Sequence, residues 1–223
     1  MPVFHSLLAR PLLYPETMAE VDRRTIAAGT PGIELMERAG KAAVRVLRGR
    51  WAPRPVAVLA GPGNNGGDGW VIARLLREVG WPVAIYSDWP LEKLSGDARQ
   101  ACAACGFSSE PLAAADFSER PLIVDALFGA GLAREITGEP AAVMARAAES
   151  DAPVLAIDLP SGLNGRTGEA LGQSLRAEVT VTFGAAKPGH LLDAGRELTG
   201  ELHIADIGLD LQADDVDAHW NGP

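Results

Sequence analysis

The sequence is short of cysteine and of long apolar runs. No stretch approaches the roughly 20 consecutive apolar residues that a membrane-spanning helix needs, and residues 1–15 lack the uninterrupted apolar segment of a secretory signal. Cys102 and Cys105 are the only cysteines, whereas secreted chains of this size more often carry several bridged pairs. These absences predict a cytoplasmic protein without a membrane partner.

Zinc ligands are also too scattered for a metal site at the cysteine pair. Zinc held by Cys-Ala-Ala-Cys at 102–105 would need two further ligands, but the four histidines lie at distant positions. A redox motif would follow a strand, and residues 96–100 have a helical pattern instead. We therefore interpret both cysteines as small residues on the core-facing side of a helix.

Basic residues are few as well. Lysine and arginine number 20 against 29 aspartates and glutamates, which gives a formal net charge of −9. Nucleic-acid surfaces hold phosphates with clustered basic side chains, and the longest basic cluster here, at residues 45–50, ends a predicted helix. The composition therefore argues against a nucleic-acid partner.

The apolar content predicts one domain over residues 1–223, because 47% of the residues are apolar and no linker separates two cores. Apolar runs of strand length occur at 56–60, 83–86, 122–124, 154–157, 179–183 and 202–204, and helical patterns at 15–28, 31–50, 70–79, 96–105 and 140–149. This alternation predicts an α/β fold, with a doubly wound, mostly parallel sheet and an N-terminal helical extension. The acidic residues 206–217 are interpreted as a solvated end.

A glycine-rich loop follows the first apolar run. Residues 61–69 read GPGNNGGDG, between the strand expected at 56–60 and the helix expected at 70–79. Glycines let the backbone N–H groups approach a ligand, and the start of a helix favours negative charge, so we expect a phosphate there. The loop is not a P-loop, because Gly67 and Asp68 stand where that motif needs lysine and then serine or threonine.

The same loop also matches the dinucleotide fingerprint G-x-G-x-x-G. Gly61, Gly63 and Gly66 fit the three glycines, and Asp88 follows the next apolar run at the expected distance. An NAD(P)-dependent dehydrogenase is therefore one open alternative. Against it, the Asp68 carboxylate would stand near the pyrophosphate and repel it unless a cation lies between them.

Carboxylates follow three of the predicted strands, at Asp68, Asp125 and Asp158. Because the carboxyl ends of parallel strands share one edge of a sheet, the three should lie together and require a bound cation, a raised pKa or both. The oxygen donors available there are Asn65, Asp125 and Ser161, which suit an alkali or alkaline-earth ion and leave potassium and magnesium as alternatives. Turn capping by Asp125 and Asp158 is the structural alternative.

Ser161 and Lys187 complete the candidate residues on this edge. Ser161 stands in Pro-Ser-Gly, which is not the nucleophile elbow of a serine hydrolase. Lys187 follows the run at 179–183, where it would neutralise a phosphate or hold a carboxylate; an ordinary surface lysine is the other interpretation.

Four ordered motifs give the chain a resemblance to a known family. They are GPGNNGGDG at 61–69, VDALFGAGL at 124–132, AIDLPSG at 156–162 and TFGAAKPG at 182–189. In these motifs, over nearly its whole length, the chain resembles the NAD(P)H-hydrate epimerases, a domain also found as the N-terminal half of bifunctional hydrate-repair proteins. The resemblance implies a Rossmann-like sheet, a potassium ion and a homodimer.

The resemblance also implies the substrate and its site. The substrate would be NADH or NADPH hydrated at nicotinamide C6, whose (R) and (S) forms the enzyme interconverts, so that a separate dehydratase receives the (S) form. Potassium would be held by Asn65, Asp125 and Ser161. The implied substrate-binding residues are Asn64, Asn65, Gly66, Gly67, Asp68, Gly129, Ala130, Gly131, Leu132, Ala133, Arg134, Glu135 and Asp158.

For the chemistry, our hypothesis is a single carboxyl group near C6. Asp158 would give a proton to the leaving oxygen and later accept one from the returning water, with Lys187 as the second candidate. Two alternatives stay open beside an epimerase: the dehydrogenase, and a non-catalytic module that binds a nucleotide or a protein without turnover.

Overall fold

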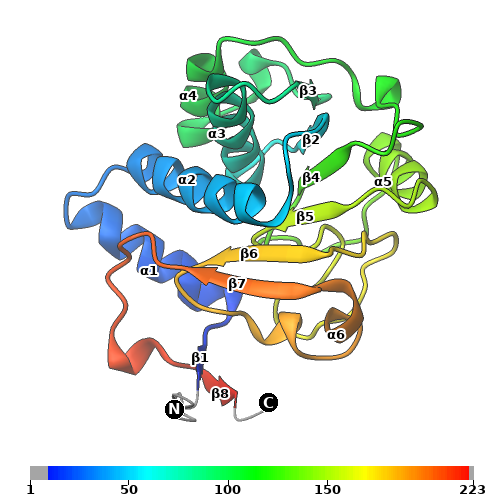
Figure 1. Cartoon of the computed structure of the whole chain (residues 1–223). Helices are drawn as coiled ribbons and strands as arrows, with labels where there is room; N and C mark the ends of the chain where they lie inside the picture. Colours follow the sequence, from blue (N-terminus) through cyan, green and yellow to red (C-terminus); the bar gives the residue numbers. More distant parts are fainter. Residues whose placement is uncertain (1–9, 221–223) are drawn as a thin grey trace, which may run out of the picture.

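The computed structural model describes residues 10–220 and is built around a six-stranded sheet (Figure 1). The strand order is β3-β2-β4-β5-β6-β7, and every neighbouring pair is parallel. The strands are β2 (Val56–Ala60), β3 (Val83–Tyr86), β4 (Leu122–Ala126), β5 (Val154–Ile157), β6 (Val179–Phe183) and β7 (Glu201–Ala205). The predicted α/β fold with a doubly wound parallel sheet is therefore confirmed.

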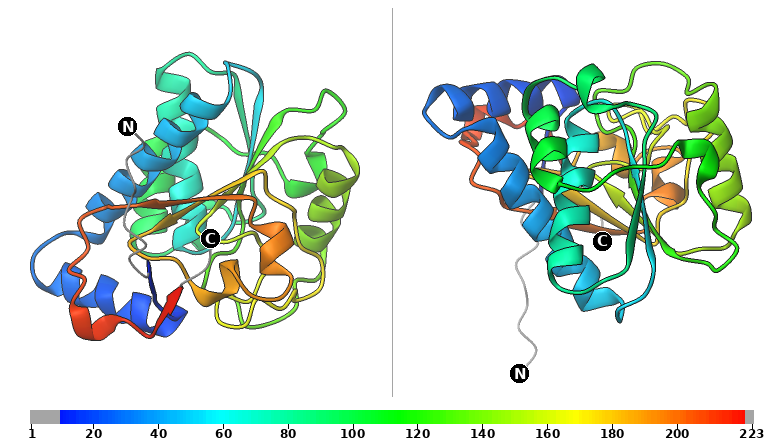
Figure 2. Two further views of the ribbon diagram at one scale, coloured as in Figure 1. Left: turned by 60° about the horizontal axis from the view of Figure 1, so that its bottom comes forward. Right: turned by 90° about the horizontal axis from the view of Figure 1, so that it is seen from above.

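Helices cover both faces of this sheet (Figure 2). On one face lie α2 (Gly32–Arg50), α3 (Asn64–Glu78) and α4 (Gly96–Cys105), and on the other lies α5 (Glu139–Glu149). Strand side chains alternate between the two cores: Val58 packs with the α2–α4 layer, and its neighbour Leu59 packs with the α5 layer. Both faces are buried, so the strands read as continuous apolar runs.

The N-terminal extension and the C-terminal segment pack together at the carboxyl ends of β6 and β7 (Figure 1). Helix α1 (Pro15–Ala27) follows β1 (Arg10–Leu12), which pairs antiparallel with β8 (Ala218–Trp220). The short helices are η1 (Leu91–Lys93), η2 (Leu112–Ala114), η3 (Pro188–His190), α6 (Gly195–Leu198) and η4 (Ala213–Asp215).

The acidic segment 206–217 is not the free solvated end that its composition suggested. The Arg24 guanidinium of α1 lies 2.6 Å from the Asp215 carboxylate, and the Asp210 N–H donates to the Thr25 hydroxyl at 2.9 Å. Asp217 accepts a hydrogen bond from the Tyr14 N–H, just before α1. The segment therefore runs along α1 and helps to fix that helix.

Helix α3 begins at Asn64, six residues earlier than predicted, so the second half of the glycine loop is helical. Three glycines in the first two turns oppose a helix on propensity alone. Packing reverses this preference, because a Cβ atom on Gly66 would overlap the backbone of Gly61, and one on Gly67 would overlap Met36 of α2. These positions require glycine because the start of α3 packs too closely against Gly61 and Met36 to leave room for a Cβ atom.

Replacing Gly66 by alanine should therefore destabilise the protein, although alanine is ordinarily the better helix former. We expect a loss of about 1–3 kcal/mol in the free energy of unfolding, because the new methyl group meets backbone that cannot move aside. Gly49→Ala is the matched control, since Gly49 lies in α2 with open space around it and should gain up to about 1 kcal/mol. Urea unfolding of both variants decides; a stabilised Gly66→Ala variant would contradict the packing argument.

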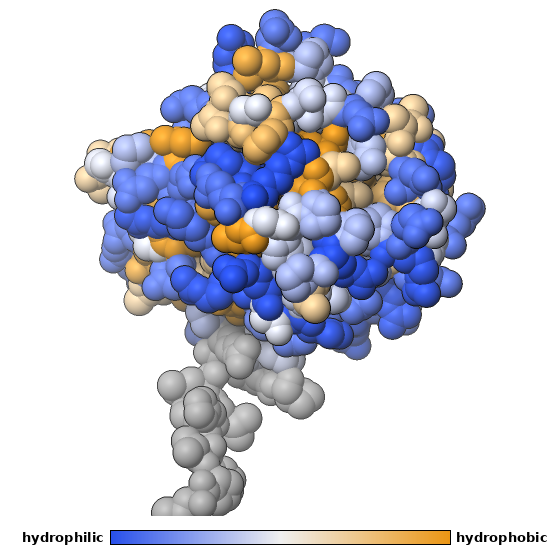
Figure 3. All heavy atoms as spheres, turned by 45° about the horizontal axis from the view of Figure 1, so that its top comes forward, coloured by the Kyte–Doolittle hydropathy of each residue, from blue (hydrophilic) through white to orange (hydrophobic). Residues whose placement is uncertain are grey.

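Six large apolar side chains of the described residues are exposed, and they come from separate segments: Ile26, Val79, Phe107, Leu192, Ile204 and Leu211. Figure 3 shows one face of the molecule, on which hydrophilic residues surround hydrophobic areas. Among the described residues, no helix combines the length and the apolar character needed to cross a membrane.

Candidate active site

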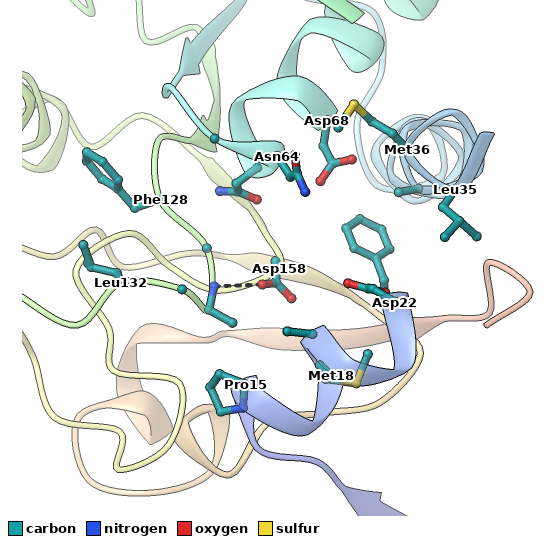
Figure 4. A pocket seen from close by; sticks show the side chains of 18 of the residues that line it. Pro15, Met18, Asp22, Leu35, Met36, Asn64, Asp68, Phe128, Leu132 and Asp158 are labelled. Atoms are coloured by element: carbon teal, nitrogen blue, oxygen red, sulfur yellow. Dashed lines mark hydrogen bonds between the residues drawn. The ribbon is translucent and has the colours of Figure 1, made fainter. Parts of the chain in front are cut away.

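A cavity of about 750 Å³ opens at the carboxyl edge of the sheet. It lies beside β2 and β4, between which the chain reverses its direction of winding, the usual place for a ligand in an open α/β sheet. Its walls come from α1, α2, the start of α3 and the loops that follow β4, β5 and β6 (Figure 4). The edge predicted from the sequence is therefore where the structure has its cavity.

Most of the predicted site residues line this cavity. Those that do are Asn64, Asn65, Asp68, Gly129, Ala130, Gly131, Leu132, Ala133, Arg134, Asp158 and Lys187. Gly66, Gly67, Glu135, Asp125 and Ser161 are not among the lining residues. Gly66 and Gly67 serve the packing of α3, while Asp125 and Ser161 are completely buried.

Asp158 stands at the centre of a dense set of hydrogen bonds. One carboxylate oxygen accepts from the Lys187 ammonium at 2.6 Å and from the Thr182 hydroxyl at 3.0 Å. The other accepts from the Ala130 N–H at 2.9 Å. Its backbone has φ = 65°, a left-handed conformation that is unusual for a residue other than glycine. The strand end thus turns sharply to aim this carboxylate into the cavity.

The surroundings of Asp158 keep its carboxylate ionised. Burial alone would raise its pKa, but the charge and hydrogen bond of Lys187, together with the Ala130 N–H, outweigh burial and lower the pKa to about 2. Lys187 is itself only 3% exposed, so the two charges neutralise each other inside the protein. Asp158 can therefore accept a proton at neutral pH but carries none to give.

His190 connects the backbones of the two residues of this ion pair through hydrogen bonds. Its Nδ1 accepts from the Lys187 backbone N–H at 3.0 Å, so its Nε2 must carry the hydrogen that is donated to the Asp158 carbonyl oxygen at 2.8 Å. Burial and the neighbouring Lys187 charge lower the pKa of His190 to about 4. The ring is thus neutral at pH 7 and is hydrogen-bonded to the backbones of both Lys187 and Asp158.

Acidification should expose this role of His190. In the unfolded chain the His190 ring takes up a proton near pH 6.5, whereas in the folded protein it does so only near pH 4. The free energy of unfolding is therefore unaffected above pH 6.5 and falls by roughly 3 kcal/mol as the pH is lowered from 6.5 to 4. His190→Gln should lack this part of the loss. Urea unfolding between pH 7 and 4 tests it, with His203→Gln on the edge strand β7 as control; an unchanged pH dependence in His190→Gln would refute the assignment.

Asp125 forms a second, deeper cluster with Ser161. Its carboxylate accepts from the Ser161 hydroxyl at 2.6 Å and from the Ser161 N–H at 2.8 Å. Burial raises its pKa, while these hydrogen bonds lower it, and no basic side chain of the described residues forms an ion pair with it. A fully buried carboxylate with neutral donors only is a place where a cation would be stabilised.

Asn65 is the third residue of the potassium site that the sequence analysis predicts. In one orientation its amide nitrogen donates to the Ile157 carbonyl at 3.0 Å and its oxygen accepts from the Gly129 N–H. This orientation satisfies both ends of the amide, whereas in the other orientation the amide oxygen lies beside that carbonyl oxygen without a donor. The described residues hold no cluster of three or more His, Cys, Asp or Glu side chains of metal-binding type. The side-chain donors of Asn65, Asp125 and Ser161 are oxygen atoms, which suit an alkali or alkaline-earth ion and not zinc.

Asp22, which the sequence analysis did not select, also faces the cavity. It projects from α1 into the cavity, on the wall opposite the start of α3 (Figure 4). No strand-end rule could find it, because it lies on a helix. The available signal was its spacing: Asp22 follows the buried Met18 by four residues, which puts a carboxyl group on the inward face of an amphipathic helix.

Asp88, by contrast, does not serve as the acidic residue of a dinucleotide site. Its carboxylate accepts from the Leu112 N–H at 2.9 Å and therefore fixes a turn, and it does not line the cavity. The fingerprint glycines are present, but the ribose contact that would complete a dehydrogenase site is absent from the described cavity wall.

Comparison with known proteins agrees with this geometry. Residues 32–189 match the family described as YjeF-related protein N-terminus. The NAD(P)H-hydrate epimerase of Lentilactobacillus buchneri is 40% identical over 87% of this chain and 93% of its own, and that of Rhodobacter capsulatus is 42% identical over 80% and 91%. The bifunctional NAD(P)H-hydrate repair enzyme of Escherichia coli is 39% identical, with 92% of this chain matching 42% of that protein.

A solved structure shares the fold. The crystal structure of yeast ynu0 (YNL200c) superposes with a TM-score of 0.69 at 21% identity, over 84% of this chain and 86% of that chain. The family match extends over most of the chain, and the two NAD(P)H-hydrate epimerases are covered over 93% and 91% of their length. This chain belongs to the NAD(P)H-hydrate epimerase family.

Proposed function

We propose that this protein interconverts the (R) and (S) forms of NADH or NADPH hydrated at nicotinamide C6. The proposal depends on one observation above all, the buried Asp158–Lys187 ion pair that faces the cavity next to the start of α3. The names of the relatives support the same reaction, a metabolite repair that would supply the (S) form to a separate dehydratase.

The substrate would span the cavity from α3 to the ion pair. Its phosphates would lie at the start of α3, where the N–H groups of Asn64 and Asn65 precede the first hydrogen bond of the helix, from Gly67 to Gly63. The loop 129–135 would contact the same end of the substrate. The hydrated ring would then reach the Asp158 carboxylate.

Inversion at C6 requires the bond between C6 and oxygen to break and form again. Asp158, held as a carboxylate, would accept a proton from the incoming water, a contribution of roughly a hundredfold to ten-thousandfold to the rate. For the donating half of the single-carboxyl hypothesis, Asp158 would rarely hold a proton at neutral pH, since its pKa is about 2. Lys187 would keep Asp158 ionised and oriented.

Asn65, Asp125 and Ser161 would hold a potassium ion, which when bound supplies positive charge beside the buried Asp125 carboxylate. Turnover should be faster in potassium than in an equal concentration of a large organic cation at matched ionic strength, because the Ser161 hydroxyl of the cluster is hydrogen-bonded to the backbone of Phe128, next to the loop at Gly129. Initial rates of epimerisation in the two salts check this. Equal rates would argue against a functional potassium site.

The direct test mixes the protein with the (R) form of hydrated NADPH and follows the epimer ratio by chromatography. Acceleration to the equilibrium mixture beyond the spontaneous rate, with no oxidised cofactor formed, is the expected result. Hydride transfer to an added substrate would instead support a dehydrogenase, and binding without acceleration would support a non-catalytic nucleotide-binding module.

Three further predictions accompany this function. One domain over residues 1–223 is supported by the six-stranded sheet, whose two faces are both covered by helices. A homodimer and a cytoplasmic location stay predictions, which size determination in solution and cell fractionation would test.

A further inference from the structure

Two carboxyl groups in the cavity have no hydrogen-bonding partner among the described residues. Asp68 projects from the second turn of α3, and Asp22 from α1, toward the same part of the cavity (Figure 4). Asp68 is only 9% exposed, yet no hydrogen bond or ion pair within residues 10–220 satisfies it. A carboxyl group so buried and unpaired is costly unless a proton or a ligand compensates it.

Asp158, on the same cavity, has the opposite surroundings. It accepts hydrogen bonds from an ammonium group, a hydroxyl and a backbone N–H, as described above. Enzymes that need both an acid and a base commonly use two carboxyl groups whose environments differ in this way. The unpaired carboxyls then carry the proton, and the paired one accepts it.

We propose that Asp68 is the general acid of this cavity and that Asp22 is the neighbouring carboxyl that keeps the proton on it. The inference rests on the proposed epimerase function and adds a proton donor for the form of the enzyme in which Asp158 is ionised; in the reverse conversion the same steps run backwards and the two carboxyls exchange roles. Asp68 would contact the C6 hydroxyl of the substrate, whereas Asp22 would act through Asp68 as a positioning residue.

The proton and the electrons balance as follows. Asp68 gives its proton to the C6 hydroxyl oxygen, the bond between C6 and oxygen breaks with its electron pair leaving on water, and N1 shares the positive charge left on the ring. Water then adds to C6 from the other face and gives a proton to the Asp158 carboxylate. Asp158 returns that proton to solvent and Asp68 regains one, so no oxidant or reductant is needed.

The electrostatics support this division. Burial raises the pKa of Asp68 well above its usual value, and the negative charges of Asp158 and Asp22 raise it further, against the lowering effect of Lys187. Burial and Asp158 likewise raise the pKa of Asp22, again against Lys187. The other charged groups on the cavity wall are Asp97 of α4 and Arg134 of the loop after β4.

The pH dependence of kcat tests the proposal, after subtraction of the spontaneous rate. Asp68→Asn should lower kcat by at least about a hundredfold while hydrated NADPH still binds in equilibrium dialysis. Asp22→Asn should be as active as the wild type at low pH, but its kcat should decline at a lower pH as the solution is made more alkaline. The reason is that Asp68 loses its proton more easily when one neighbouring negative charge is gone. Glu20→Gln, on the exposed side of α1, is the matched control and should keep the wild-type profile.

The outcomes separate this inference from the function on which it rests. A wild-type protein that does not accelerate epimerisation refutes the epimerase itself. An active wild type with an equally active Asp68→Asn variant, or an unshifted alkaline limb in Asp22→Asn, overturns the acid assignment alone. If Asp68→Asn does not fold, the Asp22→Asn profile decides, because Asp22 is only partly buried.

Discussion

Replacing Asp158 by asparagine slows epimerisation by at least about a hundredfold while hydrated NADPH continues to bind. This is the expected result because the substitution removes the only cavity carboxylate that Lys187, Thr182 and the Ala130 N–H hold in its ionised form. The amide keeps the size of the side chain but cannot accept a proton at neutral pH. Single-turnover rates and equilibrium dialysis measure chemistry and binding separately.

The control for this variant is Asp88→Asn. Asp88 also follows a strand of the sheet, but its carboxylate fixes a turn through the Leu112 N–H, outside the cavity. It should keep the wild-type rate. Full activity in Asp158→Asn would remove Asp158 from the mechanism and leave Lys187 as the remaining candidate of the pair.

Replacing Lys187 by methionine is expected to lower the free energy of unfolding at pH 7 by about 3–5 kcal/mol. The methionine fills a similar volume but leaves Asp158, whose side chain is 18% exposed, charged and without its cation. Most of the cost comes from this unpaired charge and not from lost packing. Urea unfolding of the variant measures it.

The pH dependence of the same variant distinguishes charge from packing. In the wild type the pKa of Asp158 is about 2, below its usual 3.8, so the pair stabilises the protein above pH 4 and loses its effect as pH falls toward 2. The difference between wild type and Lys187→Met should therefore shrink on acidification. Lys41→Met, at an exposed position of α2, should show no such trend; a constant difference at all pH values would point to packing.

The sequence was sufficient for the sheet and for the edge where the cavity lies. Strands buried on both faces read as plain apolar runs, and β2, β3, β5 and β6 have the predicted bounds. Because the carboxyl ends of parallel strands meet, the sequence predicts Asp68, Asp158 and Lys187 at one edge of the sheet, and all three line the cavity there. Local pattern and topology are enough to predict the position of a residue that comes directly after a strand of the sheet.

Other features depend on contacts between distant segments and could not be read locally. Glycines argued against a helix at 64–69, and only the packing against β2, α2 and α4 makes one. The acidic segment 206–217 looked solvated because nothing in its composition names Arg24 as a partner. Asp22 and His190 reach the site from α1 and η3, and their roles appear only when these elements are placed against the end of β5.

The packed start of α3 has a consequence for the energetics of recognition. Its first turns touch neighbouring backbone and side chains on several sides, so their conformation is fixed before a ligand arrives. A flexible glycine loop would have to lose conformational entropy on binding, at a cost of about 1–2 kcal/mol for each residue that becomes ordered. Here the first turns of α3 have already lost this entropy on folding, so the site is preorganised. Little of the free energy gained from the contacts between α3 and a phosphate is then spent on ordering the backbone.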